Sequence, residues 1–354
     1  MHPDNPKSLS LSQPVALLTE ATEDFSFDVY GYRFSIHSDT PETVEGIRED
    51  FAYFHTSGAA GGVKLELFDQ DPPYECLPPL DASIYTPRNV VYRNGRTRYI
   101  DYHGRALGIQ DEMTGNMKFY SRDPNLLYEA SYLYLIGQIG EYLDKRGLHR
   151  IHALGVKVNG QAVLVLLPMG GGKSTLGINL LKHPEVQLLS DDSPFIDRKG
   201  LVLAYPLRLG LLPGGESAIP AKHRRVIQRM EFGPKHLVNY SYLKDRVTDS
   251  AEPGLVMIGT RTFAPGCRIE RATLSAGLRA CIPNCVVGMG LFHGLEFVLQ
   301  ASGWEILKKS GLGISRLRNC WRLLRRSRIC RIHLGPDPEL NAHTLVEYAM
   351  AMEG

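Results

Sequence analysis

One short stretch constrains the fold of this chain more than any other. Residues 162–167 are an apolar run that predicts a strand, residues 168–172 form a glycine-rich loop, and residues 176–182 predict a helix. Lys-Ser-Thr stands between the loop and the helix, which is the order of a phosphate-binding loop. Leu167 occupies the place where that motif ordinarily has its first glycine. The alternative interpretation is a glycine-rich turn between two packed elements.

Each part of this loop has a chemical use in binding a nucleoside triphosphate. Glycines let backbone N–H groups approach phosphate oxygens, and the helix N-terminus adds free donors and the positive end of a dipole. Lys173 is predicted to neutralise the β- and γ-phosphates, and Ser174 to offer its hydroxyl oxygen to Mg²⁺. The predicted ATP-binding residues are Met169, Gly170, Gly171, Gly172, Lys173, Ser174 and Thr175.

Two acids follow the next short apolar run. Residues 186–189 predict a strand, and Asp191 and Asp192 stand just beyond it. The carboxyl end of a strand beside a phosphate loop is where a nucleotide site needs a metal ligand and a base. Ser174 and Asp191 are the predicted metal ligands. Adjacent side chains on a strand point to opposite faces, so we expect the two acids to have different roles; the alternative is a polar turn.

A histidine lies at the start of a predicted hairpin. His152 precedes the hairpin over residues 153–167, which turns at Asn159-Gly160, and stands 21 residues before Lys173. A lone histidine is more often structural than catalytic, so the residue pattern alone does not assign it a function.

Taken in order, His152, the hairpin, the phosphate loop and the Asp191-Asp192 pair resemble the HPr kinase/phosphorylase family and its kinase-like relatives. The resemblance covers about residues 148–212. It implies a P-loop kinase domain that uses ATP and Mg²⁺, with His152 functional and one aspartate as the base for the acceptor hydroxyl. The order of the pair slightly favours Asp191 as that base. Members of the family are often oligomeric, which implies a homo-oligomer.

The chain departs from the family at one acidic segment. The family's Glu-Ile-Arg-Gly segment is matched only loosely by residues 206–210, where Arg208 keeps the arginine and Pro206 replaces the metal-binding glutamate. We therefore expect a one-way kinase without the reverse phosphorylase reaction, unless Asp197 takes the place of the glutamate.

The family also has a later basic residue that contacts phosphate, for which Lys235 and Arg246 are the candidates. The predicted catalytic residues are His152, Lys173, Asp191, Asp192, Arg208 and Arg246.

The rest of the chain divides into three predicted parts. Residues 1–14 are polar and predict a disordered tip. Residues 15–120 carry short alternating strands, a hairpin at Asn94-Gly95 and a helix over 41–54, which predict an α+β accessory domain. Residues 121–354 form the predicted kinase domain of an α/β protein. It opens with a largely buried helix that starts at Asp123-Pro124 and ends at Gly147.

Composition argues against several other classes of protein. A net charge of +2 over 354 residues, with 43% hydrophobic residues, predicts a globular chain without nucleic acid as a partner. The longest apolar runs are shorter than the ~18 residues of a membrane span, and no signal peptide is evident, so we expect a cytoplasmic protein. Six cysteines without a C-x-x-C pair predict reduced structural thiols.

One segment near the C-terminus is strongly basic. Residues 304–331 hold nine basic residues and one acid. Ile314, Leu317, Trp321 and Leu324 recur at helical spacing, which predicts a packed helix with a solvated basic face. The alternatives are a docking surface for an acidic protein or peptide, or for anionic lipid.

The sequence therefore predicts an ATP-dependent kinase that transfers the γ-phosphoryl group to a hydroxyl, with a serine of a protein or peptide as acceptor. One alternative is a kinase of a small hydroxylated metabolite. Another is a nucleotide-binding regulatory module without transfer activity. The paired acids favour a kinase over a general NTPase switch, which ordinarily has a single aspartate after its strand.

Overall fold

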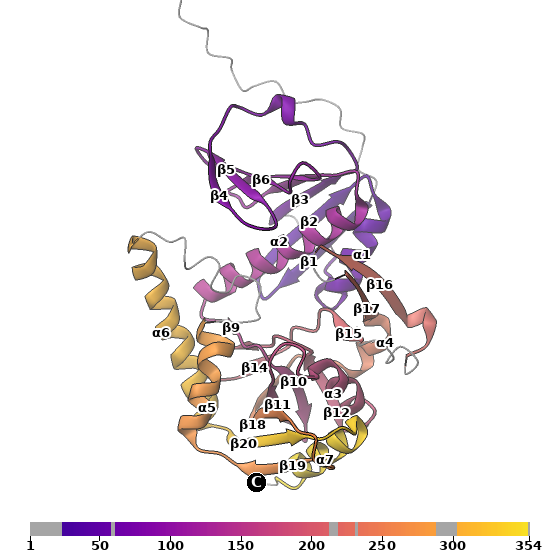
Figure 1. Ribbon diagram of the computed structural model, residues 1–354, viewed down its shortest axis with the longest axis vertical. Helices are drawn as coiled ribbons and strands as arrows, with labels where there is room; N and C mark the ends of the chain where they lie inside the picture. The colour runs from indigo at the N-terminus through magenta and orange to yellow at the C-terminus, as the bar shows by residue number, and fades with distance from the viewer. Residues whose placement is uncertain (1–22, 58–60, 212–218, 231–232, 288–302, 353–354) are drawn as a thin grey trace, which may run out of the picture.

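The computed structural model describes residues 23–57, 61–211, 219–230, 233–287 and 303–352, without the side chains of residues 23–24 and 303–310. The predicted disordered tip over residues 1–14 lies outside these ranges. The described residues form a mixed α/β fold with three sheets (Figure 1).

The first sheet has eight strands in the order β1-β2-β3-β8-β7-β6-β5-β4, with β2–β3 and β3–β8 parallel and the other pairs antiparallel. The hairpin that the sequence predicts at Asn94-Gly95 forms between β5 and β6 of this sheet, and Gly95 has a φ of 59°. The strands are β1 (Glu23–Val29), β2 (Tyr32–Ser38), β3 (Val63–Phe68), β4 (Ala82–Tyr85), β5 (Val90–Asn94), β6 (Thr97–Asp101), β7 (Leu107–Asp111) and β8 (Met117–Tyr120).

Two helices pack on this sheet, and the second one joins it to the rest of the molecule. α1 (Pro41–Phe51) follows β2, and α2 (Pro124–Lys145) begins where the Asp123 carboxylate accepts hydrogen bonds from two backbone N–H groups. α2 lies between the first sheet and the remainder of the chain (Figure 1). One apolar core extends from these helices to Phe195 and Leu237, so this packing is shared across residue 120. The domain boundaries stay a prediction.

The second sheet has a seven-strand path, β12-β10-β11-β18-β14-β13-β9, to which β20 and β19 are added beside β18. The predicted hairpin forms between β10 and β11, and Asn159 (φ 48°) and Gly160 (φ 75°) make its turn. The strands are β9 (His149–Arg150), β10 (Leu154–Val158), β11 (Gln161–Leu166), β12 (Val186–Ser190), β13 (Phe195–Ile196), β14 (Val202–Leu203), β18 (Ser250–Arg261), β19 (Arg268–Arg271) and β20 (Arg328–Leu334).

Four strands of the second sheet end at the same edge. β10 is antiparallel to both β11 and β12, so those two run in one direction, and β18 and β20 are parallel to β11. The last residues of these strands are Leu166, Ser190, Arg261 and Leu334. Ligands of open α/β sheets bind outside the carboxyl ends of such strands, so the topology selects this edge as the place for a site.

The third sheet is small and antiparallel, in the order β15-β17-β16. It lies between α1 and α2 on one side and the second sheet on the other (Figure 1). Its strands are β15 (Leu209–Leu211), β16 (Arg224–Arg229) and β17 (Gly233–Val238). The remaining helical elements are η1 (Ala52–Phe54), η2 (Tyr74–Cys76), α3 (Lys173–Leu180), η4 (Ala221–His223), α4 (Tyr240–Leu243), η5 (Lys244–Arg246), α5 (Leu274–Cys281), η6 (Ile282–Val287), α6 (Gly303–Arg325) and α7 (Pro338–Met350).

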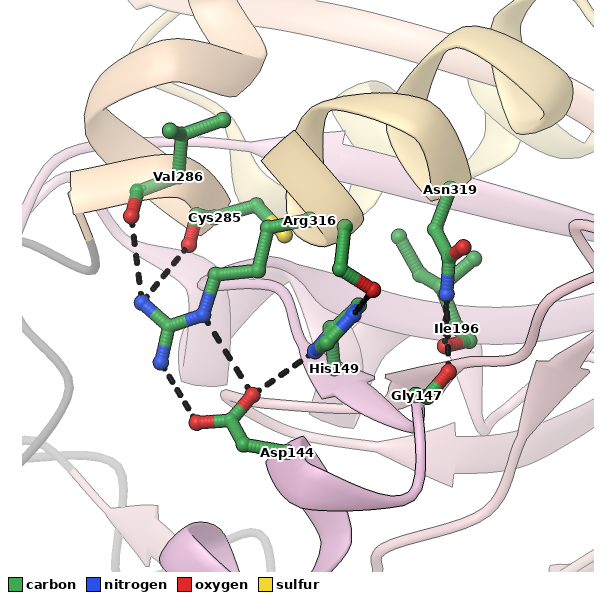
Figure 2. A network of polar contacts seen from close by, with 9 residues as sticks. Asp144, Gly147, His149, Ile196, Cys285, Val286, Arg316 and Asn319 are labelled. Carbon is green, nitrogen blue, oxygen red and sulfur yellow. Dashed lines mark hydrogen bonds and ion pairs between the residues drawn. The ribbon is translucent and has the colours of Figure 1, made fainter. Parts of the chain in front are cut away.

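A polar network fixes α6 to the end of α2 (Figure 2). The Arg316 guanidinium pairs with the Asp144 carboxylate at 2.5 Å and donates to two carbonyl groups at the end of η6. His149 bridges the same carboxylate at 2.7 Å and the Ser315 hydroxyl at 2.9 Å. Arg316 of α6 therefore links α2 to η6, and these contacts hold η6 in place.

The prediction of which face of α6 is buried is wrong, because the helix is rotated about its axis relative to the expected orientation. Ile314, Leu317 and Trp321 are 59%, 38% and 41% exposed, and only Leu324 of the predicted face is buried. The amide of Asn319 donates to the carbonyl oxygens of Gly147 and Ile196, and this polar contact turns a neighbouring stripe inward. Over residues 311–325, where the side chains of α6 are described, the buried residues are Asn319, Cys320, Leu323 and Leu324.

Two further observations bear on the predictions from composition. All six cysteines are free thiols, and four of them are buried. None of the described helices combines the length and the apolar character needed to cross a membrane.

Candidate active site

The glycine-rich loop joins the end of β11 to the start of α3, as its sequence predicts. Gly170 (φ 74°) and Gly172 (φ 96°) adopt left-handed conformations that favour glycine, and Gly172 caps the helix. The first i to i−4 bond of the helix runs from Leu176 N–H to Gly172 O at 2.9 Å. The helix therefore begins at Lys173 and ends at Leu180, three residues earlier at its start and two at its end than the sequence predicts.

Backbone pairing brings His152 beside the acids. Residues 151–153 run along residues 192–194, with Ala153 N–H donating to Asp192 O and Ile151 N–H to Pro194 O. His152 N–H donates in turn to Asn284 O of η6 at 2.8 Å. The histidine is held on both sides by main-chain bonds, so its ring position depends on the fold rather than on its own side chain.

Lys173 lies at the centre of the cluster. Its Nζ is 2.9 Å from His152 Nε2, donates to Leu167 O at 3.0 Å, and is 3.6 Å from the Asp192 carboxylate. His152 Nδ1 is 3.3 Å from the same carboxylate. A lysine ammonium only donates, so His152 Nε2 accepts this bond, and Nδ1 is the ring nitrogen that faces Asp192.

Ser174 and Asp191 form the second contact of the cluster. The Ser174 hydroxyl donates to Asp191 Oδ2 at 2.9 Å. Asp191 is buried, and its other oxygen, Oδ1, has no hydrogen-bond partner among the described residues. Burial raises the pKa of Asp191 to about 6; the charge of Asp192 adds to the increase, while Lys235, Ser174 and Gly210 oppose it.

At both Asp192 and Lys173, burial and the neighbouring charges shift the pKa in opposite directions. Burial by itself would raise the pKa of Asp192, but the hydrogen bond and charge of His152 and the charges of Lys173 and Lys235 outweigh it and lower that pKa. Burial lowers the pKa of the Lys173 ammonium, and the two aspartates limit the decrease. The side chain of Asp192 is half-exposed, whereas Asp191 is enclosed, so only Asp192 is open to a molecule from solvent.

The third sheet supplies a second cation. Lys235 of β17 influences both aspartates, and its Nζ lies 2.8 Å from where a Cβ on Gly210 would be. The backbone N–H of Gly210 also helps to lower the pKa of Asp191. Lys235 was one of two candidates for the basic residue that contacts phosphate, and the structure brings it, rather than Arg246, to the acids.

The structure separates Arg208 from this cluster. Its guanidinium pairs with Asp50 at 2.9 Å and Glu129 at 3.1 Å and lies over the Tyr132 ring. Burial disfavours its charge, but Asp50 and the other neighbours outweigh burial and raise the pKa of Arg208. Arg208 is thus a buried link between α1, α2 and β15, and the segment 206–210 reaches the site through Gly210.

Two other candidates also lie away from the acids. Arg246 donates to the carbonyl oxygens of His183 and Val186, which ties η5 to the start of β12. The Asp197 carboxylate accepts from the N–H groups of Lys199 and Leu201 in the β13–β14 turn. The Asp197 carboxylate is therefore used within this turn.

The two aspartates also differ from the sequence expectation in how they point. The strand ends at Ser190, whose hydroxyl accepts from the N–H groups of Asp192 and Ser193. The chain is turning at this point, so strand alternation no longer applies and both carboxylates face one cluster. The polar turn that the sequence analysis gave as the alternative is therefore present, and a serine before two acids is an ordinary signal for it.

The oxygen donors of this cluster fit a hard divalent cation. Mg²⁺ is ordinarily held in proteins by one or two carboxylate or hydroxyl groups together with phosphate oxygens. The unpartnered Oδ1 of Asp191 and the adjacent Ser174 hydroxyl match that donor set.

Comparisons with known proteins give likenesses to solved structures but no match by sequence. No protein-family model and no curated protein sequence matches the chain. The chain is similar to the solved structure of the Hpr(Ser) kinase/phosphatase from Coxiella burnetii, with 14% identity and a TM-score of 0.27 over 58% of this chain and 99% of that one. At this TM-score the likeness carries no argument about activity.

Proposed function

We propose that this chain is an ATP-dependent kinase that transfers the γ-phosphoryl group to the hydroxyl of a serine in a protein or peptide. The observation that carries the proposal is the contact of Lys173 with both His152 and Asp192, next to the Ser174–Asp191 pair. A packed glycine-rich turn without this function has no need for four ionisable or hydroxyl groups around one buried lysine.

The loop supplies the binding of the triphosphate. The N–H groups of the loop and of the α3 N-terminus provide donors for the phosphate oxygens. Lys173 is tied to His152 and to two loop carbonyl oxygens in the free chain, and it exchanges these for phosphate oxygens when ATP binds. Lys235 adds a second positive charge beside the two acids.

Ser174 and Asp191 hold the cation in this proposal. When bound, Mg²⁺ neutralises charge on the β- and γ-phosphates. Asp191 is enclosed and accepts from Ser174, so it is suited to binding a metal but not to reaching an acceptor. This assigns Asp191 a different role from the base that the sequence order slightly favoured.

Asp192 is the base in this proposal. Its carboxylate is ionised, half-exposed and oriented by His152. The acceptor oxygen attacks the γ-phosphorus, its O–H proton passes to Asp192, the bond from the γ-phosphorus to the bridging oxygen breaks, and ADP leaves. Positioning and electrostatic stabilisation supply most of the catalysis of such transfers.

Incubation with γ-labelled ATP and Mg²⁺ tests the proposal. Serine-containing proteins and peptides form one set of acceptors, small hydroxylated metabolites a second, and water alone a third. Label on a serine acceptor supports the proposal, and label on a metabolite alone shows that the acceptor class is wrong. Binding of ATP without any transfer over all acceptors supports a regulatory nucleotide-binding module instead.

A further inference from the structure

The element η6 closes the free edge of the segment that carries His152. The N–H groups of Ile151 and Ala153 donate to the turn after β12, whereas the N–H of His152 points the other way and donates to Asn284 O at 2.8 Å. His152 is buried, so its N–H needs a partner within the protein, and η6 supplies it. Cys285 of η6 also belongs to the apolar cluster that contains Ile151 and Ala153. The backbone at His152 is therefore held from the η6 side by a hydrogen bond and by packing.

The conformation of η6 leaves its last carbonyl groups open to donors from other segments. η6 is a short stretch of π-helix, a rare form that occurs frequently at functional sites. The last carbonyl groups of a helix have no partner within it. Asn284 O accepts from His152 N–H, and Cys285 O and Val286 O accept from Arg316 Nη1 at 3.3 and 3.1 Å. The carbonyl group that holds His152 is thus followed directly by the two that Arg316 holds.

Arg316 is fixed in turn by the end of α2. Its Nη2 pairs with one oxygen of the Asp144 carboxylate at 2.5 Å, and its Nε donates to the other at 3.3 Å (Figure 2). The side chains of Arg316 and Asp144 are 20% and 14% exposed, so the pair is largely shielded from water. A planar guanidinium can donate to a carboxylate and to carbonyl groups at fixed angles, which a lysine ammonium cannot reproduce. The described hydrogen bonds of Arg316 go to α2 and η6, so its effect on the acids passes through η6.

We propose that Arg316 is a positioning residue for phosphoryl transfer, which keeps the His152 ring between Lys173 and Asp192 by holding η6 against the His152 backbone. The inference rests on the proposed function, in which His152 orients the base. A shift of η6 takes the acceptor away from His152 N–H and moves the ring, whose nitrogens lie 2.9 Å from Lys173 Nζ and 3.3 Å from the Asp192 carboxylate. A small misplacement of a group at an active site can lower the rate by about 10²-fold.

Steady-state kinetics with varied ATP and a serine acceptor, well below the melting temperature of each variant, is the first test. Arg316→Ala should lower kcat by about 10- to 100-fold and leave the KM for ATP within about twofold, because η6 does not contribute to the glycine-rich loop. Arg316→Lys keeps a positive charge beside Asp144 and should recover part of the loss. Arg322→Ala is the matched control, because Arg322 is an exposed arginine of the same helix that donates to Arg198 O, and it should transfer at the wild-type rate.

Nuclear magnetic resonance of isotope-labelled histidine side chains is a second test that needs no catalysis. The signals of His152 are those that disappear in His152→Gln. The nitrogen shifts of an imidazole depend on the hydrogen bonds of its two nitrogens. In the chain without nucleotide, Arg316→Ala should therefore move the His152 signals, Arg316→Lys should move them less, and Arg322→Ala should leave them in place.

Unmoved His152 signals in a folded Arg316→Ala chain, or transfer by this variant at the wild-type rate, overturn the inference. If Arg316→Ala does not fold, Arg316→Lys decides by the same two measurements, and a wild-type rate or unmoved signals in that variant overturn it. A wild-type chain that transfers phosphate to none of the acceptors contradicts the proposed function itself. The His152 signals then still test whether Arg316 positions the ring, so the two failures are distinguishable.

Discussion

Lys235 lies directly over Gly210, with its Nζ 2.8 Å from the position that a Cβ on Gly210 would occupy. The backbone N–H of the same glycine helps to lower the pKa of Asp191, so one residue of β15 both acts on an acid and leaves space for a cation. The third sheet thereby contributes to the site, although its strands are far in sequence from the glycine-rich loop.

Gly210→Ala should lower the rate of phosphoryl transfer by about tenfold or more, because the new methyl group displaces the Lys235 ammonium from the acids. Nucleotide affinity should change less. Steady-state kinetics with varied ATP separates the two effects. Gly311→Ala is the control, since a Cβ there meets open space on α6. A normal rate in the Gly210 variant would show that Lys235 has no part in transfer.

Lys173→Ala should weaken the binding of ATP by about 10- to 100-fold, because the loop amides cannot replace its charge. Calorimetry with ATP and Mg²⁺ measures this. Lys182→Ala serves as the control, since Lys182 forms an exposed pair with Glu339 just beyond the far end of the same helix. Equal ATP affinity in the Lys173 variant and in the wild type is incompatible with a phosphate-binding loop.

Asp191 gives a prediction about pH. Its pKa in the folded chain, about 6, is above the ordinary value of 3.8, so the folded state binds more protons than the unfolded state between these values. Its contribution to the free energy of unfolding is present below pH ~4 and is lost as the pH rises through about 6. The melting temperature of Asp191→Asn, relative to wild type without nucleotide, should therefore rise across this window. A constant difference from pH 4 to 7 would contradict the buried position of Asp191.

Arg208 is predicted to act on stability rather than on chemistry. Arg208→Ala leaves Asp50 and Glu129 buried with less compensation, so the free energy of unfolding should fall by about 3 kcal/mol. Denaturant titration measures the loss. ATP affinity, taken well below the melting temperature, should stay close to wild type. Loss of affinity with unchanged stability would instead place Arg208 on phosphate.

The sequence predicts the loop, the hairpin and the strand before the acids because their signals are local. Asn159-Gly160 specifies a turn, and the glycines of the loop specify its left-handed residues. Long-range partners are not encoded in this way. Nothing near Arg208 in the sequence indicates that Asp50 neutralises it, and nothing near Lys235 indicates that it reaches Asp191. The prediction of which face of α6 is buried was wrong for the same reason. Asn319 determines the buried face by donating to the carbonyl oxygens of Gly147 and Ile196, which are distant in sequence.

The reverse reaction, in which inorganic phosphate removes the phosphoryl group from the product, is predicted to be absent. A buried proline, Pro206, stands where the family that the sequence resembles has a glutamate. The Asp197 carboxylate accepts hydrogen bonds from the backbone of the β13–β14 turn. A phosphate nucleophile would then lack part of its charge neutralisation. Phosphorylated acceptor, enzyme, Mg²⁺ and excess phosphate should release no pyrophosphate. Release of pyrophosphate would show that another acid completes the site.

The most direct test of the kinase assignment is the rate of transfer from γ-labelled ATP to a serine acceptor by the Asp192→Asn variant in a single turnover. The account predicts ATP affinity close to wild type and a rate lower by about 10²- to 10⁴-fold, the range of general-base catalysis. Asp197→Asn, which keeps a turn-forming oxygen, should transfer at the wild-type rate. Transfer by Asp192→Asn at the wild-type rate would contradict the account, because the half-exposed acid beside His152 and Lys173 would then have no role in the chemistry.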